Sequence, residues 1–493
     1  MDIVLVNPGG SKEGRISRHL EYDEEYMYPY SIILLQNYLL KHGITSRVID
    51  LYYTDPEELY GYCKNLEKPL VGVTAFSNNV VYAVQIIKKI KSINPSSIIV
   101  VGGKHFSYCP EDTLKNVREI DIIVRGEGEI TFYELIKALQ SGNDFENIDG
   151  LSLRKGSEIK HNPERKPEQN IDVFSLDYEK LPEYGFSRGI LLRNYEKEKI
   201  RSLPVFLGRG CSQRCVFCSF NKFKYRVRSI DMVLNEISYL KEKYNQRYFF
   251  FIDPSFCERK LFVEQFCQTL IREKYDIKWY CEARVDTPIE LLELMVRAGC
   301  ISIDFALESG STKVLKALRK NINISQTVEF AKNCSRLGIR SLLFFMVSLP
   351  EETEDDVYQT LKMARELSKY CTYLTVSTLK IFPGTELETI AYKKGILPAD
   401  FSWYNEGFYH NYTDLAERNI PLYIENLSVD FIRKVLREFD LIALSDYTTF
   451  GDFLKKSLRG IKKIPNQSYS ENVRDIRRFY GGISEKISRK FTR

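Results

Sequence analysis

At 493 residues, with 44% hydrophobic and 28% charged side chains, the chain is long enough for several packed domains and lacks the bias of a disordered or fibrous protein. No segment near Met1 is typical of a signal peptide, and no apolar run approaches the roughly 18 residues that span a bilayer. These properties predict a cytoplasmic protein with reduced thiols. The net charge of +5 is uneven, because residues 451–493 hold 12 Lys and Arg against 4 Asp and Glu. This basic end is either a surface for an anionic partner or a solvated helical face.

Residues 1–140 alternate between short β-branched strands and amphipathic helices, and we assign them to one domain. The strands are predicted at residues 3–7, 47–51, 70–75, 97–103 and 120–126. Such alternation predicts a doubly wound, Rossmann-like parallel sheet, which binds its ligands beyond the carboxyl ends of the strands. The loops at 7–10, 74–79, 102–105 and 126–129 would therefore line one rim of the sheet.

Residues 141–200 are predicted to form a linker with a small hairpin around a Lys-Gly turn. A second βα series occupies residues 201–398. Its strands are predicted at 203–207, 247–253, 277–283, 300–309, 340–350 and 373–383. Six such repeats predict a (βα)6 partial barrel of the α/β class, with its chemistry at the carboxyl ends of the strands. Residues 399–493 are predicted to form a mainly helical, basic C-terminal extension.

Three cysteines, Cys211, Cys215 and Cys218, follow the first strand of the second series. A zinc site needs a second Cys or His pair, but the five histidines are isolated along the chain. Three thiolates from one short loop can instead hold three irons of a [4Fe–4S] cluster and leave the fourth iron open to a small molecule. The other eight cysteines are scattered through apolar segments, and we expect most of them to pack in the core.

The CxxxCxxC spacing, with the aromatic Phe217 before the last cysteine, resembles the radical S-adenosylmethionine superfamily. The resemblance implies that the amino and carboxylate groups of S-adenosylmethionine chelate the open iron, and that its cleavage yields a hydrogen-abstracting 5′-deoxyadenosyl radical. It also implies an electron donor of the flavodoxin or ferredoxin type. By this resemblance the S-adenosylmethionine-binding residues are Phe217, Asp253, Ser255, Glu282, Arg284, Glu308 and Ser309. Asp304 departs from the family pattern, because relatives often carry a glycine before the glutamate.

The N-terminal stretches "VTAFSNN" and "IIVVGGKHFSYCPEDTLKN" resemble cobalamin-binding domains attached to radical enzymes. The chain lacks the DxHxxG loop that would place a histidine on cobalt, so the lower axial ligand is left open. By this resemblance the cobalamin-binding residues are Asn7, Pro8, Thr74, Phe76, Ser77, Gly102, Gly103, His105, Gly126 and Glu127.

Our leading hypothesis is a monomeric, cobalamin-dependent radical enzyme that methylates an unactivated carbon, or a phosphinate phosphorus, of a small-molecule substrate. An oxidative cyclase resembling the anaerobic magnesium-protoporphyrin monomethyl ester cyclase is the alternative with the same cofactors. A tRNA-directed methylthiotransferase is disfavoured, since such relatives carry three extra N-terminal cysteines and this domain has only Cys63 and Cys109. We therefore do not expect a nucleic-acid partner. A non-catalytic cluster-binding sensor would leave the polar strand ends unexplained.

Overall fold

The computed structural model describes residues 1–9, 29–52, 54–177, 190–191, 201–220, 223–404 and 420–444. Met1–Phe439 form one compact unit and Asp440–Arg493 a second, of which only 440–444 are described. The basic segment 451–493 therefore lies outside the described residues. Within the described ranges, no helix combines the length and the apolar character needed to cross a membrane.

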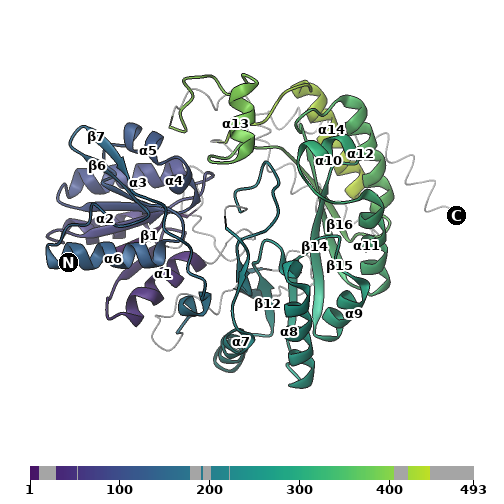
Figure 1. The fold of residues 1–493 in the computed structure, drawn as a ribbon, viewed down its shortest axis with the longest axis horizontal. Coiled ribbons are helices and arrows are strands. Elements are labelled where there is room, and N and C mark those ends of the chain that lie inside the picture. The colour runs from purple at the N-terminus through teal and green to yellow at the C-terminus, as the bar shows by residue number, and fades with distance from the viewer. Residues whose placement is uncertain are drawn as a thin grey trace, which may run out of the picture. The chain divides into compact units, whose positions relative to one another are not determined.

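The N-terminal sheet is a parallel α/β sheet with an added antiparallel edge (Figure 1). Its strand order is β2-β1-β3-β4-β5-β6-β7, and β1 to β5 run parallel. The strands are β1 (Ile3–Asn7), β2 (Arg47–Asp50), β3 (Leu70–Thr74), β4 (Ile98–Gly102), β5 (Ile122–Val124), β6 (Leu151–Lys155) and β7 (Glu158–His161). The chain reverses its direction of travel across the sheet between β1 and β3, so the crevice for a ligand is expected beyond these strand ends.

Helices cover both faces of this sheet, which explains why its central strands β1, β3, β4 and β5 are almost wholly apolar. They are α1 (Tyr30–Lys41), α2 (Pro56–Lys64), α3 (Val80–Ile93), α4 (Lys104–Tyr108), α5 (Pro110–Asn116) and α6 (Gly128–Ser141). One core cluster joins the sheet to α2, α3 and the α4–α5 segment, and another joins it to α1 and α6. The predicted doubly wound architecture is confirmed.

The hairpin that we expected inside the 141–200 linker belongs to this sheet. Strand β6 pairs antiparallel with β5, and β7 pairs antiparallel with β6. The β5 edge would otherwise expose unpaired backbone groups, and the hairpin satisfies them. We therefore propose that the N-terminal domain extends to about His161.

The second sheet contains six parallel strands in the order β16-β15-β14-β13-β12-β9, with β8 (Ile190–Leu191) antiparallel at its outer edge. The six are β9 (Arg201–Val205), β12 (Tyr248–Phe251), β13 (Lys278–Glu282), β14 (Cys300–Glu308), β15 (Arg340–Val347) and β16 (Tyr373–Thr378). Its first and last strands do not pair, so the sheet is an open, partial barrel as predicted.

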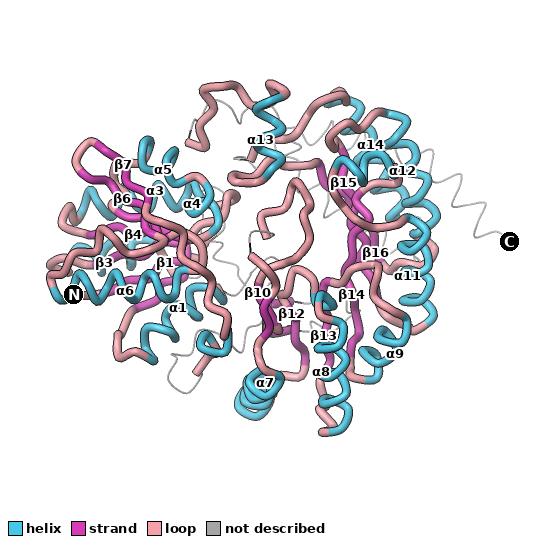
Figure 2. The backbone as a smooth tube through the Cα atoms, viewed as in Figure 1, coloured by secondary structure: helices cyan, strands magenta, loops and turns pink. Residues whose placement is uncertain are grey.

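Most helices of this domain lie along the outer face of the sheet, whereas α13 lies at the top of the view (Figure 2). The helices are α7 (Ile230–Tyr244), α8 (Lys260–Arg272), α9 (Ile289–Arg297), α10 (Thr312–Ala317), α11 (Ile324–Arg336), α12 (Glu354–Leu367), α13 (Glu386–Lys393) and α14 (Val429–Leu444). In β15, fully buried residues alternate with half-buried ones, because one face packs under helices and the other lines the barrel interior. The half-buried face is the one available to a ligand.

Candidate functional site

The three clustered cysteines lie in a loop that a two-stranded ribbon closes at its base. Strand β10 (Gly208–Arg209) pairs antiparallel with β11 (Arg226–Val227), and we call residues 208–227 the cysteine loop. A Cβ at Gly208 would lie 2.5 Å from the Arg226 carbonyl oxygen, and one at Gly210 would lie 2.5 Å from that of Phe223. Gly210 also has φ +90°. Both positions therefore require glycine, and the cysteines follow immediately where the two sides of the loop are closest.

The three thiols lie close enough to one another for their charges to interact. Cys211 and Cys215 are buried and Cys218 is half-buried, and all three are free thiols. Among the described residues, no three His, Cys, Asp or Glu side chains converge on a position for a single metal ion. A cubane cluster places each thiolate on a different iron, so thiols that gather without meeting at one point fit its donor set.

Burial raises the pKa of the Cys211 and Cys215 thiols, and the neighbouring Cys218 acts in the same direction. Iron binds the thiolate, so cluster binding would release these protons and stabilise the loop. The thiol of Cys218 already accepts a hydrogen bond from the Phe220 amide at 3.4 Å.

Asp253, which follows β12, accepts hydrogen bonds from the base of the cysteine loop. Its Oδ2 accepts from the Leu207 amide at 2.8 Å, and its Oδ1 accepts from the Gly208 amide at 2.6 Å and the Tyr225 hydroxyl at 2.8 Å. Burial raises the pKa of this carboxyl to about 6, while the three hydrogen bonds act in the opposite direction. We expected Asp253 to contact S-adenosylmethionine, but its oxygens serve the loop, so the structure favours a supporting role.

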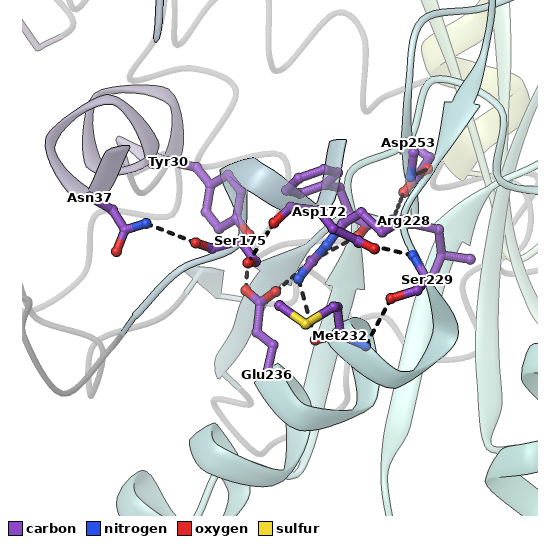
Figure 3. A network of polar contacts seen from close by, with 12 residues as sticks. Tyr30, Asn37, Asp172, Ser175, Arg228, Ser229, Met232, Glu236 and Asp253 are labelled. Carbon is purple, nitrogen blue, oxygen red and sulfur yellow. Dashed lines mark hydrogen bonds and ion pairs between the residues drawn. The ribbon is translucent and has the colours of Figure 1, made fainter. Parts of the chain in front are cut away.

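A buried ion pair next to β11 is hydrogen-bonded to helix α1 of the N-terminal domain (Figure 3). Arg228 donates to Glu236 at 2.5 Å, and its amide donates to the Leu207 carbonyl at 2.8 Å. The Tyr30 hydroxyl of α1 donates to the other oxygen of Glu236 at 2.9 Å. The Arg228 side chain is 0% exposed, so loss of either charged partner would leave a buried charge, at about 3–5 kcal/mol.

Arg284, Glu308 and Lys320 surround Cys215 at the ends of β13 and β14. All three affect the pKa of its thiol through their charges. Lys320 donates to Glu308 at 2.6 Å, and both side chains are largely buried. Glu308 has φ +70° where the β14–β15 register shifts, an unfavourable conformation for a non-glycine residue and common at functional sites. Arg284 and Glu308 were expected here; Lys320 was not, because nothing in its polar segment marks it.

A pair of carboxyl groups faces the barrel interior. Glu282 and Asp304 are direct neighbours in the β13–β14 register. Burial raises the pKa of Asp304 to about 7, and the adjacent Glu282 acts in the same direction. Solvent reaches Glu282, but the protein around it still raises the pKa of that carboxyl, with Lys320 opposing and Glu308 reinforcing the effect. Two carboxyl groups this close can share one proton.

The remaining residues expected at S-adenosylmethionine differ in availability. Ser309 is fully buried, and its hydroxyl is engaged with the Thr360 hydroxyl and the Ser311 amide, a structural arrangement. Ser255 is buried with a hydroxyl that finds no hydrogen-bond partner in the described parts of the chain, so it is available to a ligand. Phe217 is half-buried against a hydrophobic cluster of the second domain.

The N-terminal rim is built mostly from backbone. Asn7 ends β1 and Pro8 follows it, and the Asn7 side chain donates to Asp50 at 2.8 Å. Phe76 follows β3 and is 47% exposed, although a phenylalanine is normally buried. A Cβ at Gly102 would meet only the Val124 carbonyl oxygen, at 3.5 Å. The predicted rim therefore presents an exposed ring and, at Gly102, a backbone without a side chain that a bulky ligand could approach closely.

Gly103 is required for the backbone turn after β4 to form. It has φ +90°, and a Cβ there would lie 2.6 Å from the Thr74 hydroxyl and 2.7 Å from the Ala75 carbonyl oxygen. Gly126 also has a positive φ, and its amide donates to Ser107 at 3.1 Å. These contacts make Gly103 and Gly126 necessary for the rim to form.

His105 and Glu127, both expected at cobalamin, make protein contacts. The His105 ring is 1% exposed, contacts Phe106, Trp403 and Tyr404 edge-on, and hydrogen-bonds Ser77 at 3.0 Å through Nδ1. Burial lowers its pKa to about 3, so it is neutral at neutral pH.

Glu127 accepts two hydrogen bonds from Arg226 of β11, at 2.5 and 3.0 Å. Glu129, in the first turn of α6, accepts from Arg209 of β10 at 2.7 Å. Both strands of the ribbon at the base of the cysteine loop are therefore ion-paired to the N-terminal domain. The Glu127 carboxylate is used by the protein in this arrangement.

Helix α4 contacts the cysteine loop directly. The Tyr108 hydroxyl donates to the Ser219 carbonyl at 2.7 Å. Lys104 places its ammonium group over the Phe220 ring, near enough to Cys218 for their charges to interact. Sequence reasoning missed both residues, because only the tertiary structure brings the Gly102–Gly103 turn beside the cysteine loop.

Comparison with known proteins agrees with this geometry. Residues 205–364 match the radical SAM superfamily, and residues 22–136 match the B12-binding domain. The protein is a B12-binding radical SAM enzyme. An uncharacterised methyltransferase of Pyrococcus horikoshii is 28% identical to it over 433 residues, covering 85% of this chain and 89% of the relative.

Two further similarities place this radical SAM enzyme among its relatives. The anaerobic magnesium-protoporphyrin IX monomethyl ester cyclase of Rubrivivax gelatinosus is 28% identical over 351 residues, covering 69% of this chain and 62% of the cyclase. The solved structure of the cobalamin-dependent S-adenosylmethionine radical enzyme OxsB aligns with 98% of this chain and 71% of OxsB, with a TM-score of 0.67 and 18% identity. The radical SAM enzyme described here therefore shares the OxsB fold and is related to both methyltransferases and cyclases.

Proposed function

We propose that this radical SAM enzyme transfers a methyl group from methylcobalamin to an unactivated carbon, or a phosphinate phosphorus, of a small-molecule substrate. The observation that carries the proposal is the direct contact between α4, which follows the Gly102–Gly103 turn, and the cysteine loop. It supports a common reaction site for the cobalamin rim and the cluster loop. The methyltransferase relative, which matches most of both chains, favours methyl transfer as the outcome.

Different side chains of this protein would bind the cluster and S-adenosylmethionine. Cys211, Cys215 and Cys218 would hold the cluster, which fits their donor set. Bound cluster, S-adenosylmethionine and cobalamin would together supply a substrate radical and a methyl donor. Because S-adenosylmethionine carries both positive and negative groups, Arg284 would bind its carboxylate and Glu308 its hydroxyl or amino groups.

The barrel interior would receive the substrate. Glu282 and Asp304 share this interior with the stacked rings of Phe250 and Tyr280, whose centroids lie 4.4 Å apart. Asp304, with its pKa near neutrality, can accept or donate a hydrogen bond. These residues would bind a substrate that combines an apolar face with a hydrogen-bonding group.

The experiment that tests this function is a product analysis with isotopic label. Anaerobically reconstituted enzyme is supplied with methyl-deuterated S-adenosylmethionine, and small-molecule products are followed by mass spectrometry. We expect the label first on cobalamin and then on a product that gains one methyl group.

The cyclase relative supports one alternative, radical oxidation of the substrate without methyl transfer. In that case the product would lose hydrogens, gain no label and gain no carbon. Such a product would replace methyl transfer by cyclisation while leaving the cofactor sites unchanged.

A further inference from the structure

Lys104 is the residue of the N-terminal domain whose charge lies next to the expected cluster. It directly follows Gly102–Gly103 and opens helix α4. Its ammonium nitrogen is buried and has no hydrogen-bond partner within the described parts of the chain. It lies over the ring of Phe220, two residues after Cys218.

A buried ammonium without an acceptor is unfavourable, so the position calls for negative charge nearby. Burial lowers the pKa of Lys104 to about 7, and the charge of Cys218 acts in the opposite direction. The position of α4 is well defined, because the Tyr108 hydroxyl donates to Ser219 and a Cβ at Gly384 would lie 2.7 Å from Tyr108. Lys104 is therefore held beside the Cys218 side of the loop by packing that does not involve its own charge.

We propose that Lys104 is a positioning residue that raises the reduction potential of the [4Fe–4S] cluster. The inference rests on the proposed cluster ligands. One electron from an external donor, dithionite in vitro, converts the 2+ cluster to the 1+ form, and no bond is formed or broken. The reduced form carries one more negative charge, so a nearby ammonium stabilises it more than the oxidised form.

The test measures the midpoint potential of the reconstituted cluster by anaerobic dithionite titration, followed by electron paramagnetic resonance without S-adenosylmethionine. We compare the unmodified enzyme with Lys104→Met, Lys104→Arg and the control Lys115→Met, an exposed lysine of α5. We expect a more negative potential for Lys104→Met, a potential close to that of the unmodified enzyme for Lys104→Arg, and no change for Lys115→Met.

An unchanged potential in Lys104→Met with full iron content would overturn the proposal. If Lys104→Met does not retain its cluster, Lys104→Gln provides the same measurement, and loss of the cluster in both would show a structural role instead. The result is independent of methyl transfer, because neither substrate nor S-adenosylmethionine is present. If Cys211→Ala kept the cluster, the ligand set would fail, which is distinguishable from failure of the lysine proposal.

Discussion

The two strand-end rims of this enzyme differ in the chemical groups that they present. The N-terminal rim presents backbone, glycine and the exposed ring of Phe76, whereas the rim of the second sheet presents the charged side chains Arg284, Glu308 and Lys320. A corrinoid is bulky, so its site is expected to require space, while S-adenosylmethionine is small and zwitterionic, so its site is expected to require charge. Ligand binding at the N-terminal rim should therefore depend on side-chain volume, and ligand binding at the rim of the second sheet should depend on charge.

The largest expected effect is at the loop between the two rims. Replacing Cys211, Cys215 or Cys218 by alanine should each abolish the cluster and the cleavage of S-adenosylmethionine to 5′-deoxyadenosine, because each thiolate would hold a different iron. Iron content and product chromatography measure this. Cys281→Ala, a fully buried core thiol of the same domain, is the control and should keep its cluster. A dispensable cysteine among the three would contradict the ligand assignment.

Side-chain volume should determine whether the N-terminal rim binds cobalamin. Gly102→Leu should abolish cobalamin binding while leaving cleavage of S-adenosylmethionine intact, because its Cβ would make only an ordinary 3.5 Å contact with the Val124 carbonyl oxygen and the rest of the side chain would occupy the predicted rim. Absorption spectroscopy of the loaded protein measures the bound corrinoid. Gly61→Leu, with nothing within 4 Å of its Cβ, is the matched control in the same domain.

Gly103→Leu is a poorer test than Gly102→Leu, because its positive φ and short Cβ contacts would disturb the turn itself. Full cobalamin binding by Gly102→Leu would place the corrinoid elsewhere.

Side-chain charge should determine the affinity of the second rim for S-adenosylmethionine. Glu308→Gln and Lys320→Met should each weaken S-adenosylmethionine binding by about 10-fold or more, since a charge-assisted hydrogen bond contributes about 1.5–3 kcal/mol. Cobalamin binding should not change. Isothermal titration of the reconstituted enzyme with S-adenosylmethionine measures the affinity, and Lys316→Met, an exposed residue of α10, is the control. Equal affinity in Glu308→Gln would remove this residue from the site.

The smallest expected effect is on stability. The folded pKa of Asp304, about 7, lies above its ordinary value near 4, so the folded protein binds more protons than the unfolded chain between these values. Stability should therefore fall as pH rises from about 4 to about 7, and this loss persists above that range. Asp304→Asn removes the loss and should raise the melting temperature at pH 8 by more than at pH 5.

Thermal unfolding without S-adenosylmethionine measures the Asp304 effect at both pH values. Asp276→Asn, whose side chain is 83% exposed, is the control and should show no such pH dependence. A pH-independent difference for Asp304→Asn would mean that this carboxyl is charged in the folded protein.

Much of the architecture could be predicted from sequence periodicity. Apolar strands that alternate with amphipathic helices can bury their surface only as covered parallel sheets, so both sheets were predictable. The hairpin of β6 and β7 was predicted as a hairpin, but its docking was not. Two short strands carry no signal for the β5 edge that they complete, because strand pairing is set by long-range contacts.

The candidate site divides in the same way. The cysteine loop was predicted as a cluster site from the sequence alone, since three closely spaced cysteines that follow two glycines can converge within one short segment. The sequence also determined which residues follow each strand. The partners of those polar groups are set by the tertiary structure alone: Asp253 is engaged by loop donors, Glu127 by Arg226, and Glu308 by Lys320 beside Cys215. Hydrogen-bond partners come from distant segments, and the order of residues along one strand does not record what another segment brings against it.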